Sequence, residues 1–233
     1  MIAAKRELHG RRVGRPLRHR GLQAVQELLP RLRVPLTASA PLDPLTLFDH
    51  PVREVWLEIG SGDGMHAVWQ AAQNPDIGYI AVEPFVNGMA SLVAAAFEQG
   101  LQNIRVLDDD VRLLLEQLAP GSIDRAFVLF PDPWPKRRHW RRRIVNTQVL
   151  DQLGRLMPQG SELRVATDVQ DYLVWMLRVL RRHPDFDWSP ACADDWRVRP
   201  DDWPGTRFET KGLEAGRHST YLSLQRRHMS DFA

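Results

Sequence analysis

Short apolar runs alternate with longer segments of helical spacing along the chain from residue 52 onward. Five runs of four to eight residues end at turn residues, which is the pattern of strands buried on both faces of a parallel sheet. They are Val55–Ile59, Gly78–Val82, Ile104–Leu107, Ile123–Phe130 and Glu162–Ala166. Buried strands that alternate with helices predict an α/β fold with a doubly wound, mostly parallel sheet.

The segments between these runs have the spacing of amphipathic helices. In residues 87–99, Met89, Leu92 and Val93 fall on one face, and Gly100 follows as a C-terminal cap. The other predicted helices are Met65–Gln73, Val111–Leu118, Asn146–Met157 and Val169–Arg182. Beyond Pro184 the pattern is weaker, and only Ser219–Gln225 resembles a further strand.

The first 50 residues have a different composition, in which basic residues are mixed with prolines. Residues 1–20 carry one acid, Glu7, and seven basic residues: Lys5, Arg6, Arg11, Arg12, Arg15, Arg18 and Arg20. Only Gly21–Leu29 has the pattern of a helix of any length. We therefore expect a partly mobile basic N-terminal extension, residues 1–50, and one α/β domain, residues 51–233.

Charge and cysteine content narrow the class of protein. The net charge is only +2, but residues 136–143 form a second basic block without an acid. Either block alone could be a solvated surface, whereas two blocks beside one candidate site favour a phosphate-rich partner such as RNA. No run approaches the length of a membrane span, and the single cysteine, Cys192, excludes an internal disulfide. These features predict a cytoplasmic protein without a cysteine-based metal site.

A glycine-rich turn follows the first predicted strand. It reads Glu58-x-Gly60-x-Gly62-x-Gly64 and leads into the helix that begins at Met65. Glycines allow backbone amides to approach a ligand closely, and the strand places Glu58 beside the same turn. The simpler interpretation is a tight strand-to-helix turn without a ligand.

Three more acids lie at or just after the ends of later strands. Glu83 follows the second strand, Asp110 the third and Asp132 the fourth. Because the carboxyl ends of parallel strands meet at one edge, we expect these acids and Glu58 to converge there. Glu83 and Asp110 could instead cap the helices that follow them.

The acids distinguish between possible nucleotide ligands. A dinucleotide pyrophosphate requires Gly-x-Gly-x-x-Gly spacing, and Asp63 with its acidic neighbours would repel it. S-adenosylmethionine has a sulfonium and an ammonium that carboxylates attract, and a ribose diol that Glu83 could bind. The site therefore favours S-adenosylmethionine as cofactor.

The loop after the fourth strand combines an acid, prolines and the basic run. Asp132 lies among three prolines, which favour a stiff extended conformation. Trp134 could stack on a base or anchor the loop in the core, and the same two interpretations hold for Trp140. The cations of the run are suited to a phosphate backbone: Lys136, Arg137, Arg138, Arg141, Arg142 and Arg143.

Four motifs together resemble the bacterial tRNA (guanine-N7)-methyltransferase family over about residues 52–227. They are Glu58-Ile59-Gly60-Ser61-Gly62, Phe130-Pro131-Asp132-Pro133-Trp134-Pro135-Lys136 with its basic tail, Ala166-Thr167-Asp168, and Thr206-Arg207-Phe208-Glu209. The resemblance implies a Rossmann-like class I fold and methylation of guanine N7 at position 46, in the variable loop of tRNA. We expect neither a membrane nor a metal as a partner.

By matching position, the resemblance also implies roles for individual residues. Glu58, Gly60, Glu83, Asp110 and Asp132 line the methyl-donor site, and Asp132 is the catalytic acid. Lys136, Asp168, Thr206, Arg207, Phe208 and Glu209 contact the guanine. The chain departs from the family pattern in the longer spacer before Thr206, which contains Asp201-Asp202-Trp203. A methyltransferase for another RNA or a small molecule, and a non-catalytic RNA-binding protein, are the alternatives.

Overall fold

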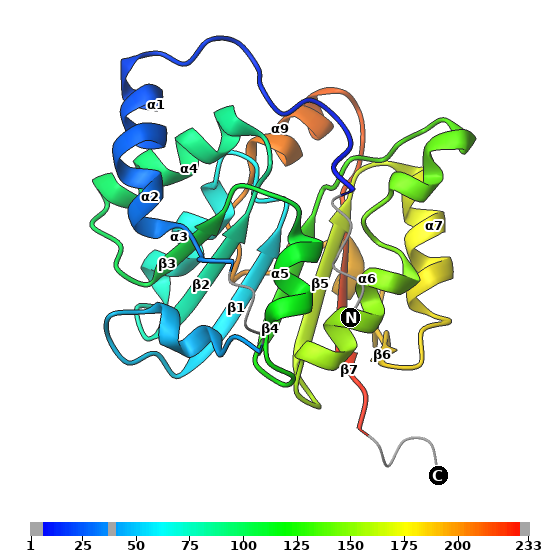
Figure 1. Cartoon of the computed structure of the whole chain (residues 1–233). Helices are drawn as coiled ribbons and strands as arrows, with labels where there is room; N and C mark the ends of the chain where they lie inside the picture. The colour runs from blue at the N-terminus through cyan, green and yellow to red at the C-terminus, as the bar shows by residue number, and fades with distance from the viewer. Residues whose placement is uncertain (1–6, 37–40, 229–233) are drawn as a thin grey trace.

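Seven strands form one sheet in the computed structural model, which describes residues 7–36 and 41–228 (Figure 1). The strand order is β3-β2-β1-β4-β5-β7-β6. The strands are β1 Glu54–Ile59, β2 Ile77–Val82, β3 Ile104–Leu107, β4 Arg125–Leu129, β5 Glu162–Thr167, β6 Phe186–Asp187 and β7 Thr220–Arg226. The first five are parallel, and β7 is antiparallel to both neighbours. The predicted mostly parallel sheet is therefore confirmed.

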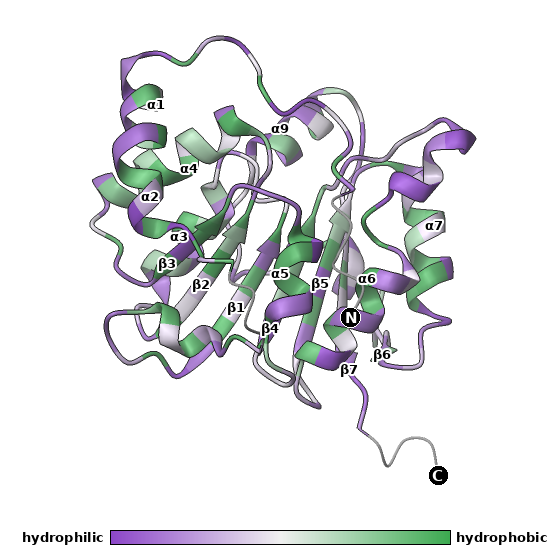
Figure 2. Cartoon of the chain, viewed as in Figure 1, coloured by the Kyte–Doolittle hydropathy of each residue, from purple (hydrophilic) through white to green (hydrophobic). Residues whose placement is uncertain are grey.

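Helices cover both faces of the sheet, so it is doubly wound. Along β1, Val55, Leu57 and Ile59 join the core of one face, whereas Trp56 joins the core of the other. Helices α5 Val111–Gln117, α6 Thr147–Leu156 and α7 Gln170–Leu180 cover the first face, and α3 Met65–Gln73 and α4 Val86–Glu98 cover the second. Figure 2 shows apolar residues along the central strands and polar residues on the outer turns of the helices.

The N-terminal extension packs against the domain in the described residues. Helical turns run through α1 His19–Gln23, η1 Ala24–Leu28 and α2 Leu29–Leu32, a longer stretch than the expected Gly21–Leu29. Ala24 and Leu29 are buried beside α4, and Val34 N–H donates to Val106 O at 2.8 Å. Lys5 and Arg6 lie outside the described residues. The partial mobility expected of the extension stays a prediction.

The C-terminal part has more structure than the sequence pattern predicts. Before β7, it contains the short helix α8 Asp194–Arg197 and the helix α9 Arg207–Glu214. Figure 1 shows α9 above the carboxyl ends of the strands, close to the crossing N-terminal segment. The fold thus gathers the glycine turn, the loop after β4 and α9 at one edge of the sheet.

Candidate active site

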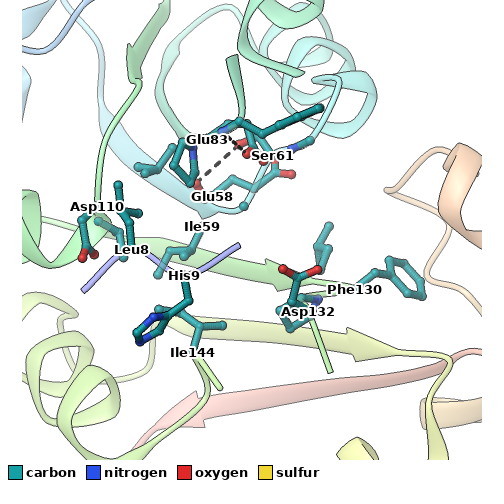
Figure 3. Close-up of a pocket in the computed structure, with 18 of the residues that line it drawn as sticks. Leu8, His9, Glu58, Ile59, Ser61, Glu83, Asp110, Phe130, Asp132 and Ile144 are labelled. Carbon is teal, nitrogen blue, oxygen red and sulfur yellow. Dashed lines mark hydrogen bonds between the residues drawn. The ribbon is translucent and has the colours of Figure 1, made fainter. Parts of the chain in front are cut away.

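A cavity of about 490 Å³ opens at the carboxyl ends of β1 to β4. All four predicted acids line it: Glu58, Glu83, Asp110 and Asp132. In Figure 3, Asp110 and Asp132 lie on opposite sides of the cavity, and Glu58 and Glu83 lie along the glycine turn. Its size is that of a small-molecule site, and its position is where ligands bind in open α/β sheets. The expected convergence of the acids is therefore found.

Two glycines allow the turn after β1 to form. Gly62 has a φ of 58°, and Gly64 has a φ of 83°, which is the left-handed region. A Cβ on Gly64 would lie 2.5 Å from the Leu92 side chain, so no larger residue fits between α3 and α4 there. The resulting turn aims Gly62 N–H at Glu83 Oε2, with a distance of 2.7 Å.

Glu83 is held in position by backbone amides. Besides the bond from Gly62, its Oε1 accepts from Phe85 N–H at 2.7 Å. Burial raises the pKa of Glu83 to about 7, although the two amides oppose the shift, and the charges of Asp132 and Glu58 add to it. Glu83 is therefore a carboxyl that changes charge near neutral pH.

Asp110 does both things that were expected of it. It caps α5, because Oδ1 accepts from Arg112 N–H at 3.1 Å, and it also lines the cavity. Its Oδ2 accepts from Glu7 N–H at 2.6 Å. The capping interpretation and the ligand interpretation are therefore compatible.

Asp132 is exposed to the cavity from a loop with a constrained backbone. The two residues Phe130 and Trp134, on either side of it, have positive φ values of 50° and 43°. Such values are strained for aromatic residues and are found where surrounding contacts enforce them. Partial burial raises the pKa of Asp132 above its ordinary value. The loop therefore presents a carboxyl at a defined place on the cavity wall.

Arg143 corrects one interpretation of the basic run. Its side chain is only 1% exposed, so it is not available to an RNA backbone. Its guanidinium lies 4.9 Å from the ring centres of Trp140 and Tyr172, and Nε donates to Pro133 O at 2.9 Å. It also pairs with Asp171. Arg143 thus ties the Asp132 loop to α7, and Trp140 is a packing residue.

The other cations of the run divide between the surface and the cavity rim. Lys136, Arg137, Arg138 and Arg141 are exposed around η3 Arg137–Arg142. Arg142 lies 4.9 Å above the Trp134 ring, and both residues line the cavity. Trp134 therefore does not anchor the loop in the core, and it borders the cavity instead.

The motif Thr206–Glu209 forms the start of α9 as a capping box. Thr206 Oγ1 accepts from Glu209 N–H at 3.2 Å, and Glu209 Oε2 accepts from Thr206 N–H at 2.6 Å. Tyr221 OH donates to Glu209 Oε1 at 2.7 Å, so the buried Glu209 carboxylate is engaged within the protein. Thr206 and Phe208 line the cavity, and Phe208 is 53% exposed.

The remaining predicted contacts lie around α9. Arg207 Nη1 is 3.5 Å from Asp63 Oδ2, which joins α9 to the glycine turn. Asp168 lies outside the cavity lining, and its Oδ2 accepts from Arg217 Nε at 2.8 Å. A Cβ on Gly212 would lie 2.7 Å from Asp168 Oδ2, so Asp168 packs directly against α9. Asp168 is therefore placed to hold this helix.

The N-terminal crossing segment, residues 7–12, is a part of the site that sequence reasoning missed. Glu7, Leu8, His9 and Arg11 line the cavity, and Figure 3 shows Leu8 beside Asp110 and His9 beside Ile144. Arg12 O accepts from Val86 N–H at 2.8 Å, which fixes the segment to the start of α4. No motif marks residues 7–12, because their position depends on backbone contacts far away in the sequence.

No group of three or more His, Cys, Asp or Glu side chains in residues 7–36 and 41–228 has the arrangement of a metal site. In the same part of the chain, no helix has the length and hydrophobicity to cross a membrane.

Comparison with known proteins gives the family. A family model described as putative methyltransferase matches residues 52–222. The chain is 46% identical over 217 residues to a tRNA (guanine-N(7)-)-methyltransferase from Chelativorans sp. (strain BNC1), covering 93% of this chain and 94% of that protein. It is 46% identical over 222 residues to the protein of the same name from Azorhizobium caulinodans, covering 95% and 96%.

Solved structures agree with this result at the level of the fold. Precorrin-6y C5,15-methyltransferase from Geobacter metallireducens GS-15 has a TM-score of 0.53 at 13% identity, over 79% of this chain and 85% of that chain. A 16S rRNA (adenine(1408)-N(1))-methyltransferase from Catenulisporales acidiphilia also has a TM-score of 0.53, at 16% identity, over 84% and 98%. The chain belongs to the family of tRNA (guanine-N(7)-)-methyltransferases.

Proposed function

We propose that the protein transfers a methyl group from S-adenosylmethionine to N7 of a guanine in the variable loop of tRNA. The observation that carries the proposal is the cavity at the carboxyl ends of β1 to β4, where four acids meet beside an exposed arginine-rich segment. The names of the relatives support tRNA as the substrate. A methyltransferase for small molecules has no need of the arginines.

The residues of the cavity fit the methyl donor. A volume of about 490 Å³ accommodates a nucleoside with an amino-acid tail. Glu83, fixed by two amides, would accept hydrogen bonds from the ribose hydroxyls, while Glu58 and Asp132 supply negative charge for the cationic groups. When bound, the donor supplies a methyl group on a positively charged sulfur. Asp110 would complete the site from the end of β3.

The chemistry requires placement more than proton transfer. Guanine N7 has a free lone pair, so no side chain needs to remove a proton before the methyl group moves. Asp132 lies on the cavity wall, where a carboxylate offsets the positive charge that the purine gains. It would also accept hydrogen bonds that orient the guanine. In this scheme, Asp132 is the catalytic residue.

Aromatic side chains at the rim would hold the guanine. Phe208 is half exposed, and its ring packs against Gly62, where a Cβ would lie 3.2 Å from it. Stacking of a base on an aromatic ring contributes about 1 to 3 kcal/mol. Because the Thr206 and Glu209 side chains bond to each other's backbone, we propose that they set the position of Phe208 and Arg207. Lys136 would contact the guanine from the loop after β4. Asp168 would hold α9 in position.

The exposed cations would bind the tRNA backbone. Arg137, Arg138 and Arg141 project from η3, and Lys136 precedes it. Contacts to phosphates confer affinity without reading sequence. The N-terminal basic residues Arg11, Arg15 and Arg18 are also exposed and would extend this surface.

One experiment tests the proposal. The protein is incubated with S-adenosylmethionine labelled in the methyl group and bulk tRNA that lacks the modification, and the product is mapped. We expect incorporation at guanine N7 of the variable loop, and Asp132→Ala should abolish or strongly reduce it. Incorporation into another RNA or into small molecules only, or unchanged activity of the variant, would overturn the proposal. Tight tRNA binding without any incorporation would instead identify a non-catalytic RNA-binding protein.

A further inference from the structure

A buried chain of polar contacts runs from the donor cavity to the inserted segment Asp201-Asp202-Trp203. It begins at Glu58, whose Oε2 accepts from Tyr79 OH at 2.7 Å and lies 2.9 Å from His66 Nδ1. Glu58 and His66 are each only 2% exposed, and both line the cavity. Neither bond uses Oε1, the second oxygen of Glu58, which leaves that oxygen for a ligand.

Gln70 determines which nitrogen of His66 carries the proton. The Gln70 amide nitrogen donates to Asp202 O at 2.7 Å and lies 3.2 Å from His66 Nε2. The carbonyl of Asp202 requires a donor, and Asn74 Nδ2 donates to Gln70 Oε1 at 3.4 Å, so the amide cannot be reversed. His66 Nε2 must therefore accept, and Nδ1–H donates to Glu58.

The inserted segment is held firmly at the other end of this chain. Asp202 Oδ1 pairs with Arg164 Nη1 at 2.6 Å, and Oδ2 pairs with Arg125 Nη1 at 3.3 Å. Burial would raise the pKa of Asp202, but the Arg164 hydrogen bond and the two guanidinium charges lower it. The carboxylate therefore stays charged, and it fixes the backbone carbonyl that Gln70 contacts.

Trp203 extends the contacts to α9. It is 3% exposed, and its ring centre lies 5.5 Å from that of His66 and 5.1 Å from that of Tyr221, with edge-to-face geometry in both pairs. Tyr221 in turn donates to Glu209 of the capping box. Trp203 itself does not line the cavity. Trp203 thus contacts His66, which binds the cavity acid Glu58, and Tyr221, which holds the start of α9.

We propose that His66 is a positioning residue that orients Glu58 for the methyl donor, and that Trp203 links this orientation to the placement of α9. The proposal rests on the proposed function for the identity of the two ligands. Donor binding then depends on His66 and Trp203 as well as on the four acids of the cavity. The inserted segment then has a role that its sequence alone does not indicate.

Two substitutions of similar size separate the roles of the two ring nitrogens. His66→Asn keeps a donor near the Nδ1 position, and His66→Gln keeps a polar group near the Nε2 position only. The affinity for S-adenosylhomocysteine is measured by titration calorimetry without tRNA, so the result does not depend on methyl transfer. We expect near wild-type affinity for His66→Asn and a loss of about tenfold for His66→Gln. Equal affinities of the two variants, whether both match the wild type or both are weaker, would overturn the positioning role.

The link to α9 is tested through Trp203. Trp203→Phe is expected to weaken S-adenosylhomocysteine binding and to raise the KM for tRNA together, while Trp196→Phe, at a partly buried tryptophan of the same region, changes neither. Circular dichroism melting confirms that each variant is folded, and Trp203→Tyr replaces Trp203→Phe if that variant is not. A rise in the KM for tRNA with unchanged S-adenosylhomocysteine affinity would overturn the link. If the wild type binds S-adenosylhomocysteine but transfers no methyl group, the proposed function fails. The calorimetric comparison of the His66 and Trp203 variants with the wild type still tests this inference.

Discussion

The charge of Glu83 should control methyl-donor binding near neutral pH. The perturbation is a change of pH between 8 and 6, with Glu83→Gln as the matched variant. Burial raises the pKa of Glu83 to about 7, and this carboxyl accepts two backbone hydrogen bonds at the cavity wall. A carboxylate accepts hydrogen bonds from ribose hydroxyls well, whereas the acid form has lost an acceptor. Donor binding should therefore compete with protonation.

The magnitude follows from the pKa. A carboxyl with this pKa is about nine-tenths charged at pH 8 and about nine-tenths protonated at pH 6. If only the carboxylate binds the ribose, the apparent Kd for S-adenosylhomocysteine rises about tenfold from pH 8 to pH 6. In Glu83→Gln, the affinity for S-adenosylhomocysteine should be weaker than in the wild type at pH 8 and should not show the tenfold change between pH 8 and pH 6. Titration calorimetry at several pH values measures both proteins, and the difference between them cancels the titration of the ligand and of other residues.

The same pKa makes a prediction about stability in the absence of ligand. The folded-state pKa of Glu83 lies above the ordinary value of 4.5, so folding favours the protonated acid. The stability that this acid contributes is present below pH 4.5 and is lost as the pH rises through 7, at a cost of about 3 kcal/mol. Urea unfolding should show this loss in the wild type and not in Glu83→Gln. Parallel pH profiles of the two proteins, in binding and in unfolding, would refute the reasoning.

Three further predictions concern the loop, the basic surface and α9. Arg143→Ala should lower the free energy of unfolding by about 3 kcal/mol and reduce kcat, because a buried paired cation and the tether to Pro133 are lost. The control Arg138→Ala, at an exposed arginine, should stay within about 0.5 kcal/mol of the wild type. Urea unfolding measures both variants, and equal stabilities would contradict the buried role of Arg143. If about five phosphates are neutralised, the logarithm of tRNA affinity should fall with the logarithm of salt concentration at a slope near −4. Removing the Arg138 cation should make that slope shallower by about one. A flat salt dependence would count against binding of the tRNA backbone. Thr206→Ala should lower the free energy of unfolding by about 1 kcal/mol. It should raise the KM for tRNA by a larger factor than the Kd for S-adenosylhomocysteine. An unchanged KM would show that the capping box does not position α9 for RNA.

The strands and the four acids could be predicted because their signals are local. A buried parallel strand is an uninterrupted apolar run, and the residue at its end lies at the ligand-binding edge for any sheet of this class. Glu58 and Asp132 could therefore be placed without coordinates. The apolar run ending at Phe130 also predicts where the chain leaves the sheet, and β4 ends one residue earlier, at Leu129.

Burial within a basic run could not be predicted in this way. Arg143 differs from Arg141 by two positions, and both belong to the same charged segment. Its burial depends on Trp140, Tyr172 and Trp175, which come together only when η3 packs against α7. A run of like charges predicts solvent exposure on average, but aromatic rings on a neighbouring helix override the pattern.

The C-terminal segment was underestimated for a related reason. The sequence Thr206 to Glu209 is a capping box that begins α9, whereas the family resemblance implies a set of guanine contacts, which stays a prediction. Glu209 is buried by its bond to Tyr221, a residue on a strand that pairs antiparallel to β5. Such long-range pairing has no local signature, so the structural function of the motif emerges only from the fold.

The position of β7 has a consequence for the way the protein is made. This strand lies between β5 and β6, and its Tyr221 holds the Glu209 carboxylate at the start of α9. On the ribosome, β1 to β5 emerge before β7, so the sheet edge that carries the four acids is synthesised before the strand that anchors α9. A nascent chain interrupted before Tyr221 would contain the four acids without the residue that holds the start of α9. Translation thus supplies the four acids of the cavity before the strand that anchors α9.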